Sequence, residues 1–176
     1  MKISKIKISG MKNPVGFALD GLRCAWTVTD TEAKQAADVK IDVAADIDFQ
    51  NILYTKEGAN LNAACEPLEM PLKPRTRYHV RVQVTGDNKE TAQGTACFET
   101  GKIDEPWQGQ WIKPQPEDKF HPVFEKAFAA KENLTAARLY ISGLGLYAAK
   151  LNGKKVSAEV LTPYTSDYQS PSRTLV

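Results

Sequence analysis

The sequence predicts an all-β protein, built from a two-layer sandwich and the beginning of a second one. Residues 22–28 and 39–43 alternate apolar and polar side chains, so that the apolar ones share one face of each strand. A proline-bearing corner at residues 72–77 precedes Tyr78, and residues 78–84 then alternate strictly. Half-buried strands of a sandwich have this period of two.

The corner also predicts which sandwich this is. Residues 72–78 read Leu-x-Pro-x-Thr-x-Tyr, which resembles the run that leads into the sixth strand of fibronectin type III and immunoglobulin-like sandwiches. There the tyrosine hydroxyl bonds to backbone a few residues upstream, and the ring packs in the core. We therefore expect the same at Tyr78. Such a motif indicates a fold and not an activity.

The remaining strands of this first unit follow the same logic. Residues 1–8 alternate apolar and basic residues and predict a first strand. Residues 46–51 are expected to form a polar loop anchored by Phe49, residues 52–54 a short strand that turns at Glu57 and Gly58, and residues 96–100 the closing strand. The count of about seven strands in roughly 100 residues fits the sandwich.

A second unit is predicted after residues 101–106, where alternation stops. We expect a fibronectin type III-like domain at 1–102, a linker at 103–108 and an incomplete antiparallel, jelly-roll-type sandwich at 109–176. Its features are alternation at Leu139 and Ile141 up to a Gly-x-Gly corner, and Asn152-Gly153, a signal for a type I′ hairpin. Roughly 68 residues are too few for a whole sandwich of this type, so we expect a fragment of a longer protein.

Composition limits the classes of function. The chain has 176 residues, of which 42% are hydrophobic and 25% charged, and a formal net charge of +2. Interspersed charges argue against nucleic acid as a partner, and neither a membrane partner nor a secretory signal is expected. The three cysteines are odd in number and lack metal-ligand spacing, which favours reduced thiols and a cytoplasmic location.

At the level of whole blocks, the chain resembles the N-terminal region of bacterial α-L-rhamnosidases of glycoside hydrolase family 78. In that family a fibronectin-type module precedes a rhamnosidase N-terminal sandwich. The resembling blocks occur in the family's order and lie at residues 13–19, 107–112, 122–128, 137–147, 151–154 and 161–168.

The resemblance implies an accessory part of an inverting enzyme that removes terminal α-L-rhamnose from glycosides or polysaccharides. Inversion needs one carboxylic acid and one carboxylate, and the family's catalytic residues lie in a later (α/α)₆ barrel. We therefore expect no catalytic residue, cofactor or metal here, no activity of the chain alone, and as partners the missing downstream domains and, through the whole enzyme, a rhamnose-containing glycan. The alternative is a stand-alone carbohydrate-binding or adhesion module without catalysis.

Other motifs favour structural interpretations. Residues 143–148 match G-x-G-x-x-A, but a strand and the Asn-Gly turn follow where a dinucleotide site needs a helix. Asn133 begins a formal glycosylation acceptor, which we interpret as a surface loop. His79 and His121 are too isolated to predict a metal site, and the aspartates of residues 46–48 lack the spacing of a calcium loop.

Aromatic residues supply the candidates for sugar contact. Tyr164, Asp167 and Tyr168 combine two rings with one carboxylate, a pattern suited to sugar faces and hydroxyls, although a loop that docks against the missing domains is the favoured interpretation. Trp107 and Trp111 flank the boundary, and we favour a role in packing the two sandwiches together over the alternative of sugar binding. An incomplete second sandwich also predicts exposed edges and self-association.

Overall fold

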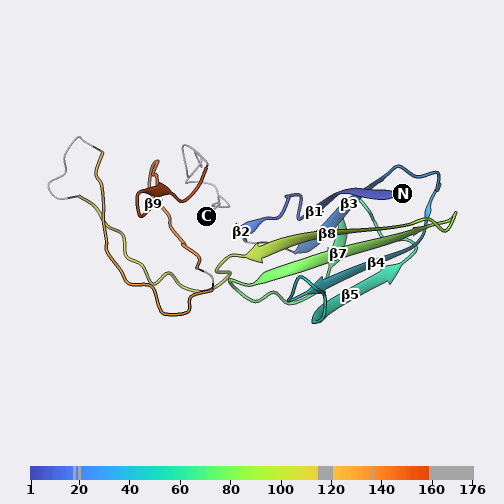
Figure 1. Cartoon of the computed structure of the whole chain (residues 1–176), viewed down its shortest axis with the longest axis horizontal. Coiled ribbons are helices and arrows are strands. Elements are labelled where there is room, and N and C mark those ends of the chain that lie inside the picture. Colours follow the sequence, from blue (N-terminus) through green and yellow to red (C-terminus); the bar gives the residue numbers. More distant parts are fainter. Residues whose placement is uncertain (18, 20, 115–120, 136, 159–176) are drawn as a thin grey trace.

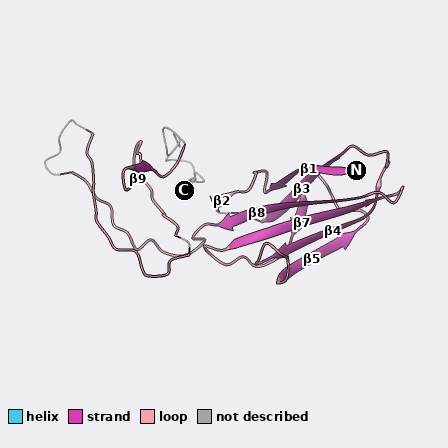
Figure 2. Ribbon diagram, viewed as in Figure 1, coloured by secondary structure: helices cyan, strands magenta, loops and turns pink. Residues whose placement is uncertain are grey.

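The structure is a computed structural model that describes residues 1–17, 19, 21–114, 121–135 and 137–158. Within these residues it is all-β and contains no helix, hence none long and apolar enough to cross a membrane (Figures 1 and 2). The strands are β1 (Lys2–Ile8), β2 (Val15–Phe17), β3 (Leu22–Thr29), β4 (Ala36–Ala44), β5 (Ile52–Gly58), β6 (Glu66–Leu68), β7 (Arg77–Gly86), β8 (Thr91–Thr100), β9 (Lys150–Leu151) and β10 (Lys154–Lys155).

The first eight strands form the predicted sandwich of two sheets. One sheet has the order β1-β3-β6 and the other β2-β8-β7-β4-β5. Neighbouring strands are antiparallel except β2, which pairs in parallel with the end of β8. Figure 1 shows these strands gathered at one end of the molecule, with the later residues as a separate set of loops. The immunoglobulin-like fold class is confirmed.

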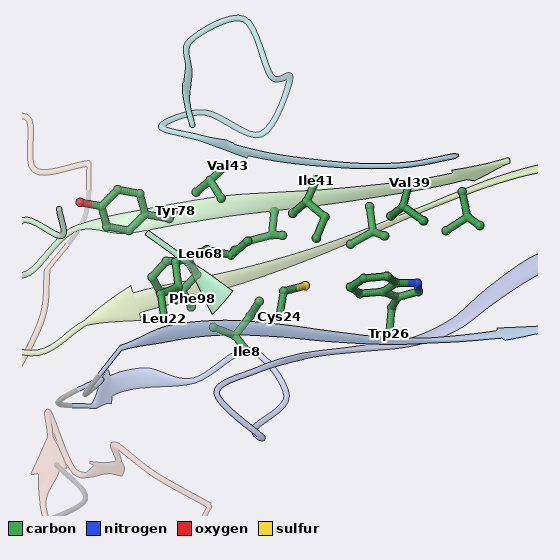
Figure 3. Packing of buried hydrophobic residues seen from close by; sticks show 13 residues of the cluster. Ile8, Leu22, Cys24, Trp26, Val39, Ile41, Val43, Leu68, Tyr78 and Phe98 are labelled. Carbon is green, nitrogen blue, oxygen red and sulfur yellow. The ribbon is translucent and has the colours of Figure 1, made fainter. Parts of the chain in front are cut away.

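The core lies between the two sheets and is made by the alternating apolar residues. Cys24 and Trp26 of β3 face Val39 and Ile41 of β4 across the layer (Figure 3). Phe98 of β8 stacks on the ring of Tyr78 with centroids 5.0 Å apart. Burial, together with the nearby Glu66 carboxylate, raises the pKa of the Cys24 thiol to about 12, so this cysteine stays a neutral part of the core.

The tyrosine corner is confirmed. Tyr78 is buried, and its hydroxyl accepts the backbone N–H of Lys73 at 2.8 Å. The bond reaches five residues upstream, so it closes the loop that carries Pro74 onto the start of β7. The N–H of Lys73 thereby has an acceptor although it lies outside any strand.

Three short features differ from the prediction. The strand expected at residues 52–54 continues to Gly58, because residues through that position pair with β4, and the expected turn at Glu57 is wrong. Strands β2 and β6 were not predicted, since each has three residues and no visible alternation. Neither strand can be recognised from the pattern of apolar residues in the sequence.

The second unit contains little regular structure in its described residues. The predicted hairpin is present: β9 and β10 pair around Asn152 and Gly153, whose φ values of 50° and 78° are those of a type I′ turn. The strand expected around residues 139–141 does not form. Its large apolar side chains are exposed, as are most of those between residues 107 and 156, including Trp111, Val123, Phe128, Leu139, Leu144, Leu146 and Leu151.

Candidate domain junction

The described residues bring charged side chains together at one place, where β8 ends and the chain leaves the sandwich. Phe98 faces the core, so the next side chain along the strand, Glu99, faces outward from the five-stranded sheet. Glu99 is nevertheless buried, with 7% of its surface exposed. An outward carboxylate at a strand end is buried only if another part of the chain covers it.

Two arginines provide that cover. Arg77 lies directly opposite Glu99 on β7 and places a guanidinium nitrogen 3.3 Å from the carboxylate. Arg138, from the second unit, donates from Nε to Oε1 at 2.5 Å and from its terminal nitrogen to Oε2. A fork of two parallel bonds is the strongest geometry for this pair. The Arg138 hydrogen bonds hold the pKa of Glu99 below its usual value, although burial alone would raise it.

Thr100 fastens the same strand end to the tyrosine corner. Its hydroxyl donates to the carbonyl of Lys73 at 2.6 Å and accepts the backbone N–H of Thr76 at 2.9 Å. The Thr100 backbone N–H in turn donates to the carbonyl of Thr76. The loop before β7 and the end of β8 therefore form one rigid unit, which fixes where Glu99 is presented.

The segment that follows β8 is also tied to the sandwich. The N–H of Gly101 donates to the carbonyl of Phe17 at 3.2 Å. The guanidinium of Arg75 binds the Glu105 carboxylate through two nitrogens, which lie 2.7 and 3.0 Å from its two oxygens. The ammonium of Lys102 lies 5.5 Å from the ring centroid of Trp107. These contacts restrain the residues between the two units.

An open depression of about 370 Å³ lies beside this segment. Its walls are mostly apolar side chains from both sheets and from the segment itself: Phe17, Leu19, Leu22, Met70, Leu72 and Ile103. Thr100 and Asp104 are its polar members. Among the described lining residues Asp104 supplies one carboxylate, whereas glycoside hydrolysis needs a pair.

Elsewhere in the described residues the buried carboxylates are engaged by cations. The short pairs outside the junction are Asp42 with Arg81 at 2.6 Å and Glu66 with Lys56 at 2.7 Å. Burial alone would raise the pKa of Glu66, but the hydrogen bonds from Lys56 and from the Asn62 N–H lower it. A general acid needs a raised pKa, so neither Glu66 nor Glu99 is suited to that role.

The candidates from the sequence are placed as follows. Tyr164, Asp167 and Tyr168 lie outside the described residues. Trp107 and Trp111 are 52% and 71% exposed, so the expectation that they pack two sandwiches together is wrong in this structure. The reason is that the described part of the second unit pairs just two short strands and offers no sandwich face to pack against.

The histidines and the aspartate loop have ordinary surroundings. His79 is half-buried on β7, and His121 is exposed. Asp46 accepts the N–H groups of Gln50 and Asn51, at 2.9 and 2.7 Å, and these bonds lower the pKa of its carboxyl, the bond from Gln50 most. Among the described residues no three His, Cys, Asp or Glu side chains gather as a metal site would require.

Sequence patterns did not reveal the pairing of Glu99 with Arg138. The two residues are separated by 39 positions, and Arg138 lies outside any strand. One signal was present: a charged residue directly after the core residue Phe98, opposite an arginine on the neighbouring strand, indicates an ion pair on the outer face.

Fold and junction together define a class: an immunoglobulin-like module attached to the start of a second β unit. Comparison with family descriptions identifies both parts. Residues 3–104 match the family described as "Rha78A-like, N-terminal immunoglobulin domain", and residues 132–174 match "Alpha-L-rhamnosidase N-terminal domain". The first match covers more than half of the chain, which therefore belongs to the Rha78A-like N-terminal immunoglobulin domain family.

Solved structures agree on the fold. The α-L-rhamnosidase of Streptomyces avermitilis, solved with L-rhamnose, is similar with a TM-score of 0.57 and 19% identity over 64% of this chain. The enzyme from Dictyoglumus thermophilum gives 0.55 and 18% over 66%, and that from Aspergillus terreus 0.51 and 15% over 59%. The chain spans 12%, 14% and 12% of those three proteins respectively. No curated protein sequence matches it.

Proposed function

We propose that this chain is the accessory, non-catalytic N-terminal part of an inverting α-L-rhamnosidase, an enzyme that hydrolyses terminal α-L-rhamnose from glycosides or polysaccharides. The observation that carries the proposal is the order of the two family matches, with the immunoglobulin-like domain at 3–104 followed by the rhamnosidase N-terminal domain at 132–174. A generic adhesion module would not require the second match.

The chemistry of the described residues supports a non-catalytic role. Inversion needs a protonated carboxylic acid on one side of the glycosidic bond and a carboxylate that activates water on the other. Glu66 and Glu99 are held ionised by Lys56 and Arg138, and both have lowered pKa values. We therefore assign the catalytic pair to a later part of the parent protein.

The test is hydrolysis of an aryl α-L-rhamnoside by the full-length product of the encoding gene. We expect the full-length protein to release rhamnose, first as the β-anomer because the enzyme inverts, and residues 1–176 alone to release none. NMR of the fresh product distinguishes the anomers, and an aryl β-D-glucoside is the control substrate. Absence of rhamnose release by the full-length protein would refute the assignment.

A second candidate function is a stand-alone carbohydrate-binding module, favoured by the exposure of Trp107 and Trp111. Exposed indole rings are suited to stack on sugar faces. In this proposal Tyr164, Asp167 and Tyr168 supply further contacts. Titration of residues 1–176 with L-rhamnose, followed by tryptophan fluorescence, separates the two functions: saturable binding without catalysis in the full-length protein supports the module, and no binding argues against it.

A further inference from the structure

Besides Arg77 of β7, the residues next to Glu99 come from an extended segment with two different faces. Side chains of extended chain alternate from one side to the other. Arg138 binds Glu99, and Tyr140, two positions later, is half-buried beside the same carboxylate. Leu139 and Ile141, on the opposite side, are 56% and 36% exposed. One face therefore contacts the immunoglobulin-like module, and the other, apolar face is turned away from it.

On the module side of this contact, Glu99 is held in place by bonds within the module itself. Glu99 is fixed by the ladder between β7 and β8, and its neighbour Thr100 is bonded to the tyrosine corner. Arg77 already supplies one cation on the outer face. A carboxylate held on a strand loses little conformational entropy when it accepts a second arginine, which favours a defined pairing over a diffuse one.

We propose that Glu99 is the anchor through which the immunoglobulin-like module docks the second unit, with Arg138 as its ligand and Tyr140 as the side chain that shields the pair from water. Leu139 and Ile141 then face the interior of the second unit, so residues 138–141 serve both the interface between domains and the core of one of them. The proposal goes beyond the proposed enzymatic function and holds whether or not the parent protein releases rhamnose.

The docking can be tested on residues 1–176 by ¹⁵N relaxation of backbone amides. If the anchor holds, the amide of Tyr140 has an order parameter near that of rigid backbone, about 0.85, as β8 does. We expect Glu99→Gln and Arg138→Met each to lower it to below about 0.6, the range of flexible segments. Arg138→Lys keeps the charge without the fork and should fall between these values.

The double variant and a control decide the interpretation. Because Glu99 and Arg138 act as one pair, Glu99→Gln combined with Arg138→Met should lower the Tyr140 order parameter no further than either single variant. Lys131→Met, an exposed lysine of the same unit, should leave it unchanged. Retained amide shifts in β4 and β7 establish that the module is folded in every variant. A rigid Tyr140 in both single variants, or a flexible one in the unaltered protein, would overturn the proposal.

Discussion

The immunoglobulin-like module and the segment from residue 107 to 156 contain similar alternating sequence but differ in what the alternation achieves. In the module, Val80 and Val82 of β7 are fully buried because the three-stranded sheet lies across from them. In the later segment, Leu139 and Leu151 each belong to a stretch that alternates in the same way, yet both side chains are more than half exposed. Figure 2 shows strands throughout the first region and mostly loops in the second.

This difference shows that alternation only places apolar side chains on one face of a strand. Those side chains are buried where a second sheet packs against that face. Burying an apolar side chain of this size is worth about 1.5–3 kcal/mol, but only where a partner removes it from water. Among the described residues, the second unit pairs two strands of two residues each, and an isolated hairpin is at best marginally stable in water. The predictions below test the comparison from the largest expected effect to the smallest.

Truncating a core aromatic should affect only the first region strongly. Phe98→Ala removes the ring that stacks on Tyr78 and leaves a cavity between the sheets, at an expected cost of about 3–5 kcal/mol in the free energy of unfolding. Phe128→Ala, at a side chain that is 71% exposed, should change it by less than about 0.5 kcal/mol. Urea unfolding followed by circular dichroism measures both, and equal losses would contradict the comparison.

The tyrosine corner should contribute through one hydrogen bond. Tyr78→Phe keeps the buried ring but removes the acceptor of the part-buried bond from the Lys73 N–H, which should cost about 0.5–1.5 kcal/mol in the free energy of unfolding. The matched control is Tyr54→Phe, whose hydroxyl accepts a longer, exposed bond of 3.3 Å from the Glu69 N–H and should cost about 0.5 kcal/mol or less. A Tyr78→Phe variant as stable as the control would show that the corner bond is dispensable.

Acid should release the second unit from the first. The pKa of Glu99 is lowered in the folded protein from an ordinary value of 4.5. The stabilisation that comes from its ionised form is therefore fully present above pH 4.5 and is lost as the pH falls through the lowered pKa. Arg77 pairs with the same carboxylate, and Arg138 and Tyr140, whose pKa values are raised, stay protonated throughout this range. We expect the Arg138 Nε–H resonance in NMR to move reversibly, below pH 4.5, toward the chemical shift of an unpaired guanidinium as Glu99 is protonated.

Two variants assign this acid transition. Glu99→Gln should give Arg138 Nε–H the chemical shift of an unpaired guanidinium throughout the titration, because a neutral amide does not bind the guanidinium as a carboxylate does. Glu105→Gln removes the other acid near Tyr140, which is paired with Arg75, and should leave the transition in place. If the acid transition disappears in Glu105→Gln and persists in Glu99→Gln, the group that titrates is Glu105, and the assignment to Glu99 is wrong.

Self-association should come from the second region and be weak. The exposed side chains of Phe128 and Leu144 contribute to apolar surface that a second copy of the chain can cover. We expect residues 1–176 to show concentration-dependent dimerisation in sedimentation velocity, reduced severalfold in the Phe128→Ser, Leu144→Ser variant. A monomer at all concentrations up to about 0.1 mM, corresponding to a free energy weaker than about 5.5 kcal/mol, would refute this expectation.

Much of the module could be predicted from sequence because its signals are local. Apolar residues at every second position mark β3, β4 and β7 in the sequence, and the corner residues before Tyr78 mark a backbone geometry that few sequences satisfy. Strand β2 was not predicted because three residues are too few to show a periodic pattern and its partner, the end of β8, is distant in the chain. The Glu99–Arg138 pair was not predicted because it also joins residues that are distant in the chain, and such pairing is a property of the fold.

The parallel pairing of β2 with β8 has a consequence for the order of events during synthesis. The ribosome releases Val15 early and Glu99 late, yet the two lie side by side in the finished sheet. Strand β2 therefore waits without a partner while β3 to β7 emerge, and the edge of the larger sheet closes only after Thr100 has left the exit tunnel. Arg138 follows later still, so every strand of the module has emerged before the arginine that Glu99 binds.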